Sequence, residues 1–192
     1  MLGESLPTAC RWDVRILPAT SDAVRIPSTL TLVTDPIEHL HLAPHPEGGY
    51  YREYYRGSGN VSTSNGERST ATAIHFHLPP FSRSHFHRLR SDELWFWQDG
   101  GIATAYLLHG DDSLTTHLIG PPMSDGMSYI VFPRETWFAA ETADEGVLVS
   151  CVVAPGFDFA DFELGRRSEL LRAFPRHEDL IRRCTRAEDD GR

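Results

Sequence analysis

The amino-acid sequence predicts an all-β fold, because the central part of the chain is a succession of short strand-like runs. Nine such runs lie between Tyr50 and Val153, and none of the stretches among them has a sustained helical period. Clusters of Gly, Pro, Asp and Asn separate the runs, as turns do. Many short strands with frequent turns are typical of a sandwich or barrel. We therefore expect antiparallel sheets that are closed into a barrel or stacked in two layers.

The predicted elements begin with a short helix near 35–41, because Asp35 can cap it and Pro36 suits its first turn. Alternating apolar residues between turn signals then predict the strands. These strands are Tyr50–Tyr55, Thr70–Leu78, Ser84–Leu89, Glu93–Trp97, Ile102–Leu108, Thr115–Ile119, Ser128–Phe132, Phe138–Ala140 and Val147–Val153.

The two ends of the chain differ from its centre. Residues 1–34 contain three Pro and show no helical period, so we expect a short N-terminal arm there. Residues 166–192 carry apolar residues at helical spacing and eight of the 18 Arg, which predicts a C-terminal helical tail. Residues 35–165 remain as a single β domain, since 192 residues leave little room for a second fold of roughly 100 residues.

Charge and composition exclude several classes of function. All 18 basic residues are Arg, so Schiff-base and other chemistry that needs a Lys amine is excluded. A formal net charge of −9 disfavours binding to nucleic acid or to an anionic membrane. The chain has no apolar run long enough for a membrane helix or signal peptide, and its three separated Cys indicate reduced thiols. We expect a cytoplasmic protein that binds neither nucleic acid nor membrane.

The candidate site starts from His85 and His87, which lie two residues apart. On a regular strand such side chains point to the same face. Glu93, at the start of the next strand, would face the same space. Two imidazoles and a carboxylate suit a divalent metal with open positions, such as Fe, Zn, Ni or Mn. We therefore expect His85, His87 and Glu93 as metal ligands, with His87 and Glu93 as the catalytic groups.

Three separated motifs resemble one branch of the cupin superfamily. The spacing His85-x-His87-x5-Glu93-x6-Gly100 resembles the first motif of that superfamily. In the second motif, which is matched loosely from Gly126 onward, the usual His falls on Phe138. Three segments resemble the fifth cupin subfamily, a domain of unknown function. They are His45–Glu53, Ser84–Arg88 with Asp92–Trp95, and Ala154–Leu164. The resemblance spans roughly 36–165 and implies a double-stranded β-helix of the jelly-roll type and a homodimer.

Further polar and aromatic residues are expected to bind a ligand. His75 and His77 form a second pair on a strand that the resemblance places beside the pocket, and Arg52 suits a carboxylate or phosphate. Trp95 and Trp97 alternate with Glu93, and indoles beside a carboxyl group raise its pKa. The full set of expected ligand-binding residues is His45, Glu47, Arg52, His75, His77, Trp95, Trp97 and Phe138.

Three functions remain open at this point, and each uses the interior of the barrel. The first is a metalloenzyme that acts on a small polar organic molecule through His85, His87 and Glu93. The second is metal-independent proton transfer of the kind found in sugar-epimerase cupins, to which the family is similar in fold; here Arg52 would replace a Lys that this chain lacks. The third is a ligand-binding or structural dimer without catalysis.

Overall fold

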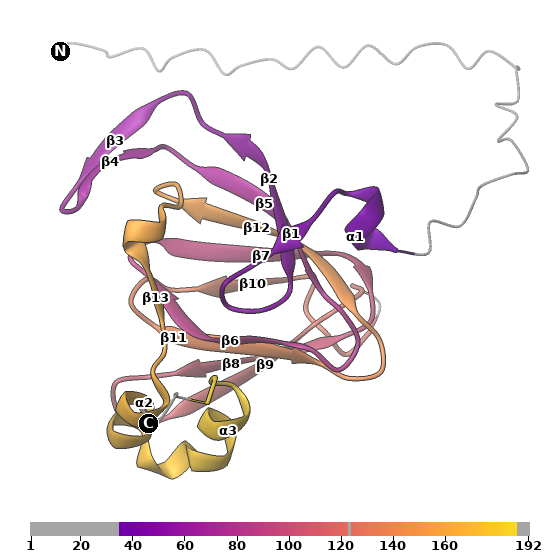
Figure 1. The fold of residues 1–192 in the computed structure, drawn as a ribbon, viewed down its shortest axis with the longest axis vertical. Coiled ribbons are helices and arrows are strands. Elements are labelled where there is room, and N and C mark those ends of the chain that lie inside the picture. The colour runs from indigo at the N-terminus through magenta and orange to yellow at the C-terminus, as the bar shows by residue number, and fades with distance from the viewer. Residues whose placement is uncertain (1–34, 123, 188–192) are drawn as a thin grey trace, which may run out of the picture. The chain divides into compact units, whose positions relative to one another are not determined.

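A computed structural model of the chain describes residues 35–122 and 124–187, and these residues form the predicted all-β fold. Two antiparallel sheets lie face to face, and short helices follow them at the C-terminal end (Figure 1). This arrangement confirms the jelly roll and the helical tail. The expected N-terminal arm lies outside the described residues. No helix within 35–122 or 124–187 is long and apolar enough to cross a membrane.

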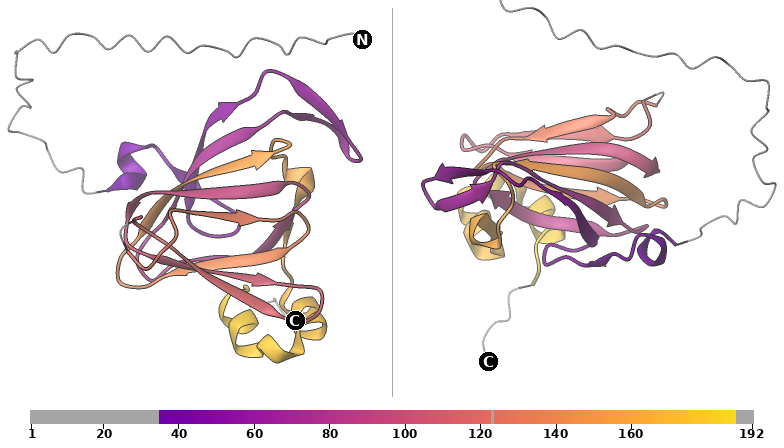
Figure 2. Two further views of the ribbon diagram at one scale, coloured as in Figure 1. Left: turned by 180° about the vertical axis from the view of Figure 1, so that it is seen from behind. Right: turned by 90° about the horizontal axis from the view of Figure 1, so that it is seen from above.

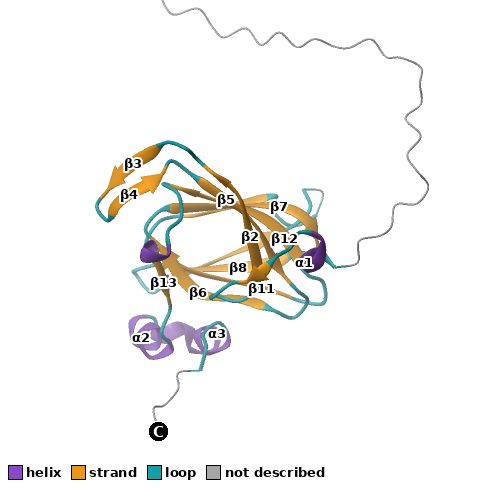
Figure 3. Cartoon of the chain, turned by 45° about the horizontal axis from the view of Figure 1, so that its top comes forward, coloured by secondary structure: helices purple, strands orange, loops and turns teal. Residues whose placement is uncertain are grey.

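The larger sheet has six strands in the order β1-β2-β5-β12-β7-β10. Their bounds are Ala43–Pro44, Tyr50–Arg56, Thr72–Leu78, Val147–Ala154, Asp92–Gly100 and Tyr129–Phe132. The smaller sheet has five strands in the order β13-β6-β11-β8-β9. Their bounds are Phe162–Leu164, Arg83–Leu89, Trp137–Thr142, Ala103–Leu108 and Leu114–Ile119. Figure 3 looks between the two sheets, whose facing sides enclose the interior of the barrel.

All nine predicted strands are present as β2 and β5–β12, with small changes at their ends. Four further strands were not predicted. β1 and β13 are too short for an alternating pattern to be visible, and β3 (Asn60–Thr63) and β4 (Gly66–Ser69) form a separate hairpin. The Asn-Gly pair at 65–66 is a hairpin signal that could have revealed this hairpin.

The interior and the outside of the barrel have separate apolar clusters. Between the sheets, Phe76, Trp95, Phe132 and Phe138 are almost fully buried and pack with aliphatic residues of both sheets. On the outer side of the smaller sheet a second cluster covers Phe86. It comes from α2 (Arg167–Ala173) and α3 (Glu178–Arg183), which lie beside this sheet in Figure 2.

The predicted N-terminal helix is also present, as α1 (Pro36–His39). The side chain of Asp35 caps it by accepting a hydrogen bond of 2.8 Å from the backbone N–H of Ile37. Pro36 occupies the first turn, where its missing N–H costs no hydrogen bond.

Candidate functional site

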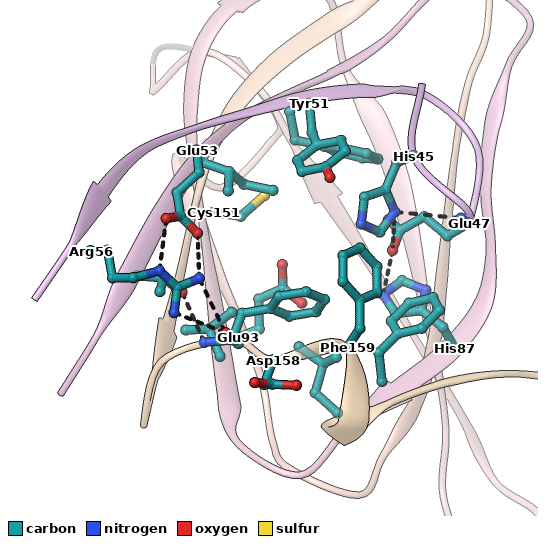
Figure 4. Close-up of a pocket in the computed structure, with 17 residues that line it drawn as sticks. His45, Glu47, Tyr51, Glu53, Arg56, His87, Glu93, Cys151, Asp158 and Phe159 are labelled. Carbon is teal, nitrogen blue, oxygen red and sulfur yellow. Dashed lines mark hydrogen bonds and ion pairs between the residues drawn. The ribbon is translucent and has the colours of Figure 1, made fainter. Parts of the chain in front are cut away.

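One cavity of about 440 Å³ opens between the two sheets (Figure 4). Its walls come from β2, β5, β6, β7 and β12 and from the segment that leads into β13. The lining residues are His45, Glu47, Tyr51, Glu53, Arg56, Thr72, Ile74, Phe76, His87, Leu89, Glu93, Cys151, Val153, Phe157, Asp158, Phe159 and Phe162. The cavity thus combines several carboxyl groups and two imidazoles with a largely aromatic wall, which is the usual composition of a small-molecule site.

A bulge in β2 decides which of its side chains enter the cavity. Tyr51 and Glu53 line it, and the pairing with β5 then shifts between Glu53 and Tyr55. An extra residue in one strand reverses the faces beyond it. Arg56 consequently lines the cavity, whereas Arg52 is exposed on the other face and donates to the carbonyl oxygen of Leu40 at 3.1 Å. Arg52 precedes the bulge and alternates with Tyr51 and Glu53, so it lies outside the cavity that it was expected to reach.

His75 and His77 also lie on the outer face of the larger sheet, because Ile74 and Phe76 occupy the inward positions of β5. The ring of His75 lies 4.5 Å from that of Tyr54, whose hydroxyl is 2.7 Å from that of Ser150. His77 Nδ1 lies 3.0 Å from the carbonyl oxygen of Val147. Neither imidazole lines the cavity, although the family resemblance had led us to expect both beside it.

A second bulge, in β6, separates His85 from His87. Phe138 pairs with His87 but Ala140 pairs with Ser84, so β6 has an extra residue between these points. Ser84 and His87 therefore both reach the carboxyl group of Glu47, and His85 does not line the cavity. The expectation that both histidines share a face was wrong because it assumed unbroken alternation.

Glu47 is the centre of a buried polar cluster, and the turn that carries it also carries His45. Its Oε2 atom lies 3.2 Å from Nδ1 of His45 and 3.2 Å from Nε2 of His87, and its Oε1 accepts from Ser84 at 2.8 Å. Burial alone would raise the pKa of Glu47, but the charge of His87 and the contacts with His45 and Ser84 outweigh it and lower the pKa. Glu47 is thus an anion held among donors.

His45 and His87 each have one ring nitrogen beside Glu47, but the surroundings of their other ring nitrogen differ. Nδ1 of His87 faces the carbonyl oxygen of His85 at 2.8 Å and Nε2 faces the carboxylate of Glu47, so both nitrogens of this ring lie beside acceptors. Burial lowers the pKa of His87, and the negative charge of Glu47 opposes that effect. The free nitrogen of His45, Nε2, points toward the middle of the cavity in Figure 4.

Glu93 lines the cavity beside Cys151 and behaves oppositely to Glu47. It is 7% exposed, accepts a 2.8 Å hydrogen bond from the indole of Trp95, and contacts the thiol of Cys151. Burial, together with the negative charge of Glu47, raises its pKa to about 8. Glu93 is therefore a protonated acid at neutral pH.

The other expected aromatic residues form a layer behind the cavity wall. Trp95 packs between Phe132 and Phe76, with ring centroids 5.2 and 5.4 Å away, and Phe138 lies 4.1 Å from the ring of His87. Trp97 packs against the same core. These residues hold Glu93 and His87 in place. The sequence had led us to expect them in the cavity wall, but they are not among the lining residues.

The side chains present do not fit the expected metal site. His85 is outside the cavity, and its Nδ1 lies 2.6 Å from the carbonyl oxygen of Glu47. Both nitrogens of His87 are engaged, and Glu93 bonds to Trp95. Within residues 35–122 and 124–187, no three His, Cys, Asp or Glu side chains are grouped as metal ligands would be. No step through Fe, Zn, Ni or Mn follows from this arrangement.

The mouth of the cavity is formed by residues that the sequence did not reveal. Arg56 donates two hydrogen bonds to Glu53, at 2.9 and 2.7 Å, across from Asp158 and Phe159. The segment that carries Asp158 is anchored to the β3–β4 hairpin by a buried ion pair of 2.7 Å between Arg68 and Asp161. The alternating aromatic and acidic residues of this segment, from Phe157 to Phe162, are the sequence signal that could have revealed it.

Comparison with known proteins places this cavity in a family. The family described as Cupin superfamily (DUF985) matches residues 34–165. The chain belongs to this family. The resemblance of the three sequence motifs is thereby confirmed, and the cavity is the interior of a cupin barrel.

Individual cupins of similar sequence extend the match to most of the chain. An uncharacterized protein of Saccharomyces cerevisiae is 30% identical over 166 residues, which cover 76% of this chain and 81% of the yeast protein. A crystal structure from Shewanella oneidensis is 34% identical with a TM-score of 0.73, covering 79% of this chain and 96% of that one. A hypothetical protein from Leishmania major is 31% identical, with the same TM-score and coverage of 79% and 97%. These names state no activity.

Proposed function

We propose that this cupin is an enzyme that transfers a proton on a small polar organic molecule held in the barrel. His45, oriented by Glu47, is the base, and Glu93 is the acid. One observation carries the proposal: His45, held by the carboxylate of Glu47, lines the same cavity as the buried carboxyl group of Glu93, and the pKa values of the two carboxyl groups are shifted in opposite directions. Such divergence is how acid and base roles are divided between similar side chains.

The base is built as a carboxylate–imidazole pair. Nδ1 of His45 lies 3.2 Å from Oε2 of Glu47 and 3.4 Å from the backbone N–H of the same residue. With the Nδ1 proton donated along the shorter contact, to the carboxylate, Nε2 is left free to accept a proton from the ligand. The anionic Glu47 then stabilises the imidazolium that forms. His87 and Ser84 fix Glu47 from the other side, so they are positioning residues rather than catalytic ones.

Glu93 can act as an acid because its burial away from water raises its pKa. With a pKa of about 8, Glu93 retains its proton at neutral pH and can return one to the ligand. Removal of a proton beside a carbonyl group and its return from another direction gives an epimerase or isomerase type of reaction. Of the three functions that the sequence leaves open, this geometry supports the metal-independent one best, with no part for Arg52.

Solvent deuterium exchange tests the proposal. The protein is incubated in D2O with small ketones that carry hydroxyl, amino or trimethylammonium groups, and proton NMR follows exchange beside the carbonyl. We expect protein-dependent exchange that is lost in His45→Gln and retained in His75→Gln, because His45 lines the cavity and His75 does not. Absence of exchange across the panel, or its persistence in His45→Gln, would contradict the proposal and favour ligand binding without catalysis.

We also propose the homodimer that the family resemblance implies. On the outer face of β7 and β10, the exposed side chains of Phe96, Tyr129 and Val131 form an apolar row in which Phe96 pairs with Tyr129. A second copy would remove this row from water. Sedimentation velocity should show a dimer that Tyr129→Glu converts to a monomer; a monomeric parent protein would refute it.

A further inference from the structure

The charges that line the cavity are unbalanced, and the imbalance concerns the kind of ligand it accepts. Four carboxyl groups line it, from Glu47, Glu53, Glu93 and Asp158, against a single guanidinium, that of Arg56. Glu93 is protonated at neutral pH, which leaves three carboxylates. Three negative charges and one positive charge give −2, or −1 when His87 carries a second proton.

The single guanidinium, that of Arg56, already forms hydrogen bonds within the protein. Arg56 makes two short hydrogen bonds to Glu53, and its remaining donors lie 3.4 Å from the carbonyl oxygen of Phe157. An anionic ligand would therefore find no free cation among the lining residues and would approach two carboxylates. Because like charges repel strongly in a partly desolvated cavity, anions are disfavoured.

The apolar part of the wall is aromatic and surrounds the proposed base. Ring centroids of Tyr51, Phe162 and Phe159 lie 4.6, 5.7 and 6.1 Å from that of His45. Phe157 lies 5.0 Å from Phe159, which is 52% exposed at the mouth. The faces of aromatic rings carry negative electrostatic potential and attract cations, most strongly those that shed their water easily.

We infer that the ligand of this cavity is a small organic cation, such as a substituted ammonium compound. The aromatic wall would contact its alkyl groups, and Asp158 and Glu47 would balance its charge (Figure 4). This inference rests on the proposed function for the location of the ligand. It also sharpens that function, because a positive charge on the ligand makes neighbouring C–H groups more acidic and so easier for His45 to deprotonate.

Three probes of similar shape and different charge test the inference. Choline is cationic, 3,3-dimethyl-1-butanol is its neutral isostere, and pivalate is an anion with the same branched end. Binding to the full chain is measured by calorimetry at low salt. We expect choline to bind about tenfold more tightly than the neutral isostere and pivalate not to bind. Equal binding of choline and the alcohol, or tighter binding of pivalate, would overturn the inference.

Matched variants locate the binding and separate it from folding. Phe159→Leu and Asp158→Asn should each weaken choline binding by about three- to tenfold, and Asn keeps the ability of residue 158 to cap the following turn. Phe81→Leu, an exposed aromatic residue that does not line the cavity, should leave it unchanged, and thermal unfolding verifies that each variant is folded. Choline affinity that is unaffected by both cavity variants would refute the site.

The binding and exchange assays can fail independently. Exchange into a neutral ketone that depends on His45, with no preference for choline, would sustain the proposed function and overturn the cation inference. Choline binding that depends on Phe159 and Asp158, without any exchange, would sustain the inference and overturn proton transfer.

Discussion

The two faces of the larger sheet carry similar residues in opposite roles. On the inner face, Tyr51 and Glu53 of β2 line the cavity close to His45. On the outer face, Tyr54 and His75 form an equally close aromatic pair at 4.5 Å. Both faces thus have a Tyr, a His and polar partners, but only on the inner face do the Tyr and the His line a common cavity. Enclosure, not residue type, makes one of them a site.

Replacing His45 or His75 by glutamine should reveal the largest difference between the two faces. His45→Gln removes the base and should lower the rate of deuterium exchange by about 10² to 10⁴ fold, the range typical of general base catalysis. His75→Gln should change it less than about twofold, because His75 faces away from the cavity. Both rates come from the NMR exchange assay. Equal losses in the two variants would show that the faces do not differ as described.

Stability should separate the same two faces. Phe76→Ala opens a hole on the inner face of β5, where the side chain is 1% exposed, and should cost about 3–5 kcal/mol. Phe96→Ala, at 37% exposed on the outer face, should cost under about 1 kcal/mol when both variants are made in the Tyr129→Glu protein, which we expect to be monomeric. Urea denaturation followed by circular dichroism measures both. A larger loss for Phe96 would place the core on the other side of the sheet.

The buried acid gives the inner face a characteristic pH dependence. Between about pH 4.5 and 8 the unfolded chain has released the proton of Glu93 while the folded protein keeps it, so stability should fall as pH rises through this window. The loss should amount to a few kcal/mol in total. Glu93→Gln should flatten this part of the stability curve, whereas Glu38→Gln, in the exposed helix α1, should not. An unchanged slope in Glu93→Gln would mean that the carboxyl group titrates normally.

Substitution of Arg56 or Arg52 should give the smallest of these effects, a change in the affinity for choline. Arg56→Ala frees the carboxylate of Glu53 and makes the cavity more negative, so choline should bind about two- to fivefold more tightly. Arg52→Ala should have no effect, since its guanidinium bonds the carbonyl oxygen of Leu40 outside the cavity. Calorimetry at low salt measures both. Weaker choline binding in Arg56→Ala would show that Arg56 holds the ligand instead of balancing Glu53.

Much of the fold was predictable because its signals are local. Alternation and turn residues were sufficient for nine strands, and Asp35 with Pro36 marked the start of α1. Parts of the site were predictable as well: His45, Glu47, His87 and Glu93 all line the cavity. Their individual roles were not, because the hydrogen-bond partners of each group come from other strands.

What the sequence determined by itself is the chemistry available to this cupin: many carboxyl groups, ten His, arginine as the sole basic residue, and short strands that must close into a barrel. Only the tertiary structure decided which of these groups meet. The alternation of side chains is a local property, but bulges in β2 and β6 reverse it, and they depend on pairing with β5 and β11. Burial then sets the pKa values, since desolvation depends on every neighbouring strand at once.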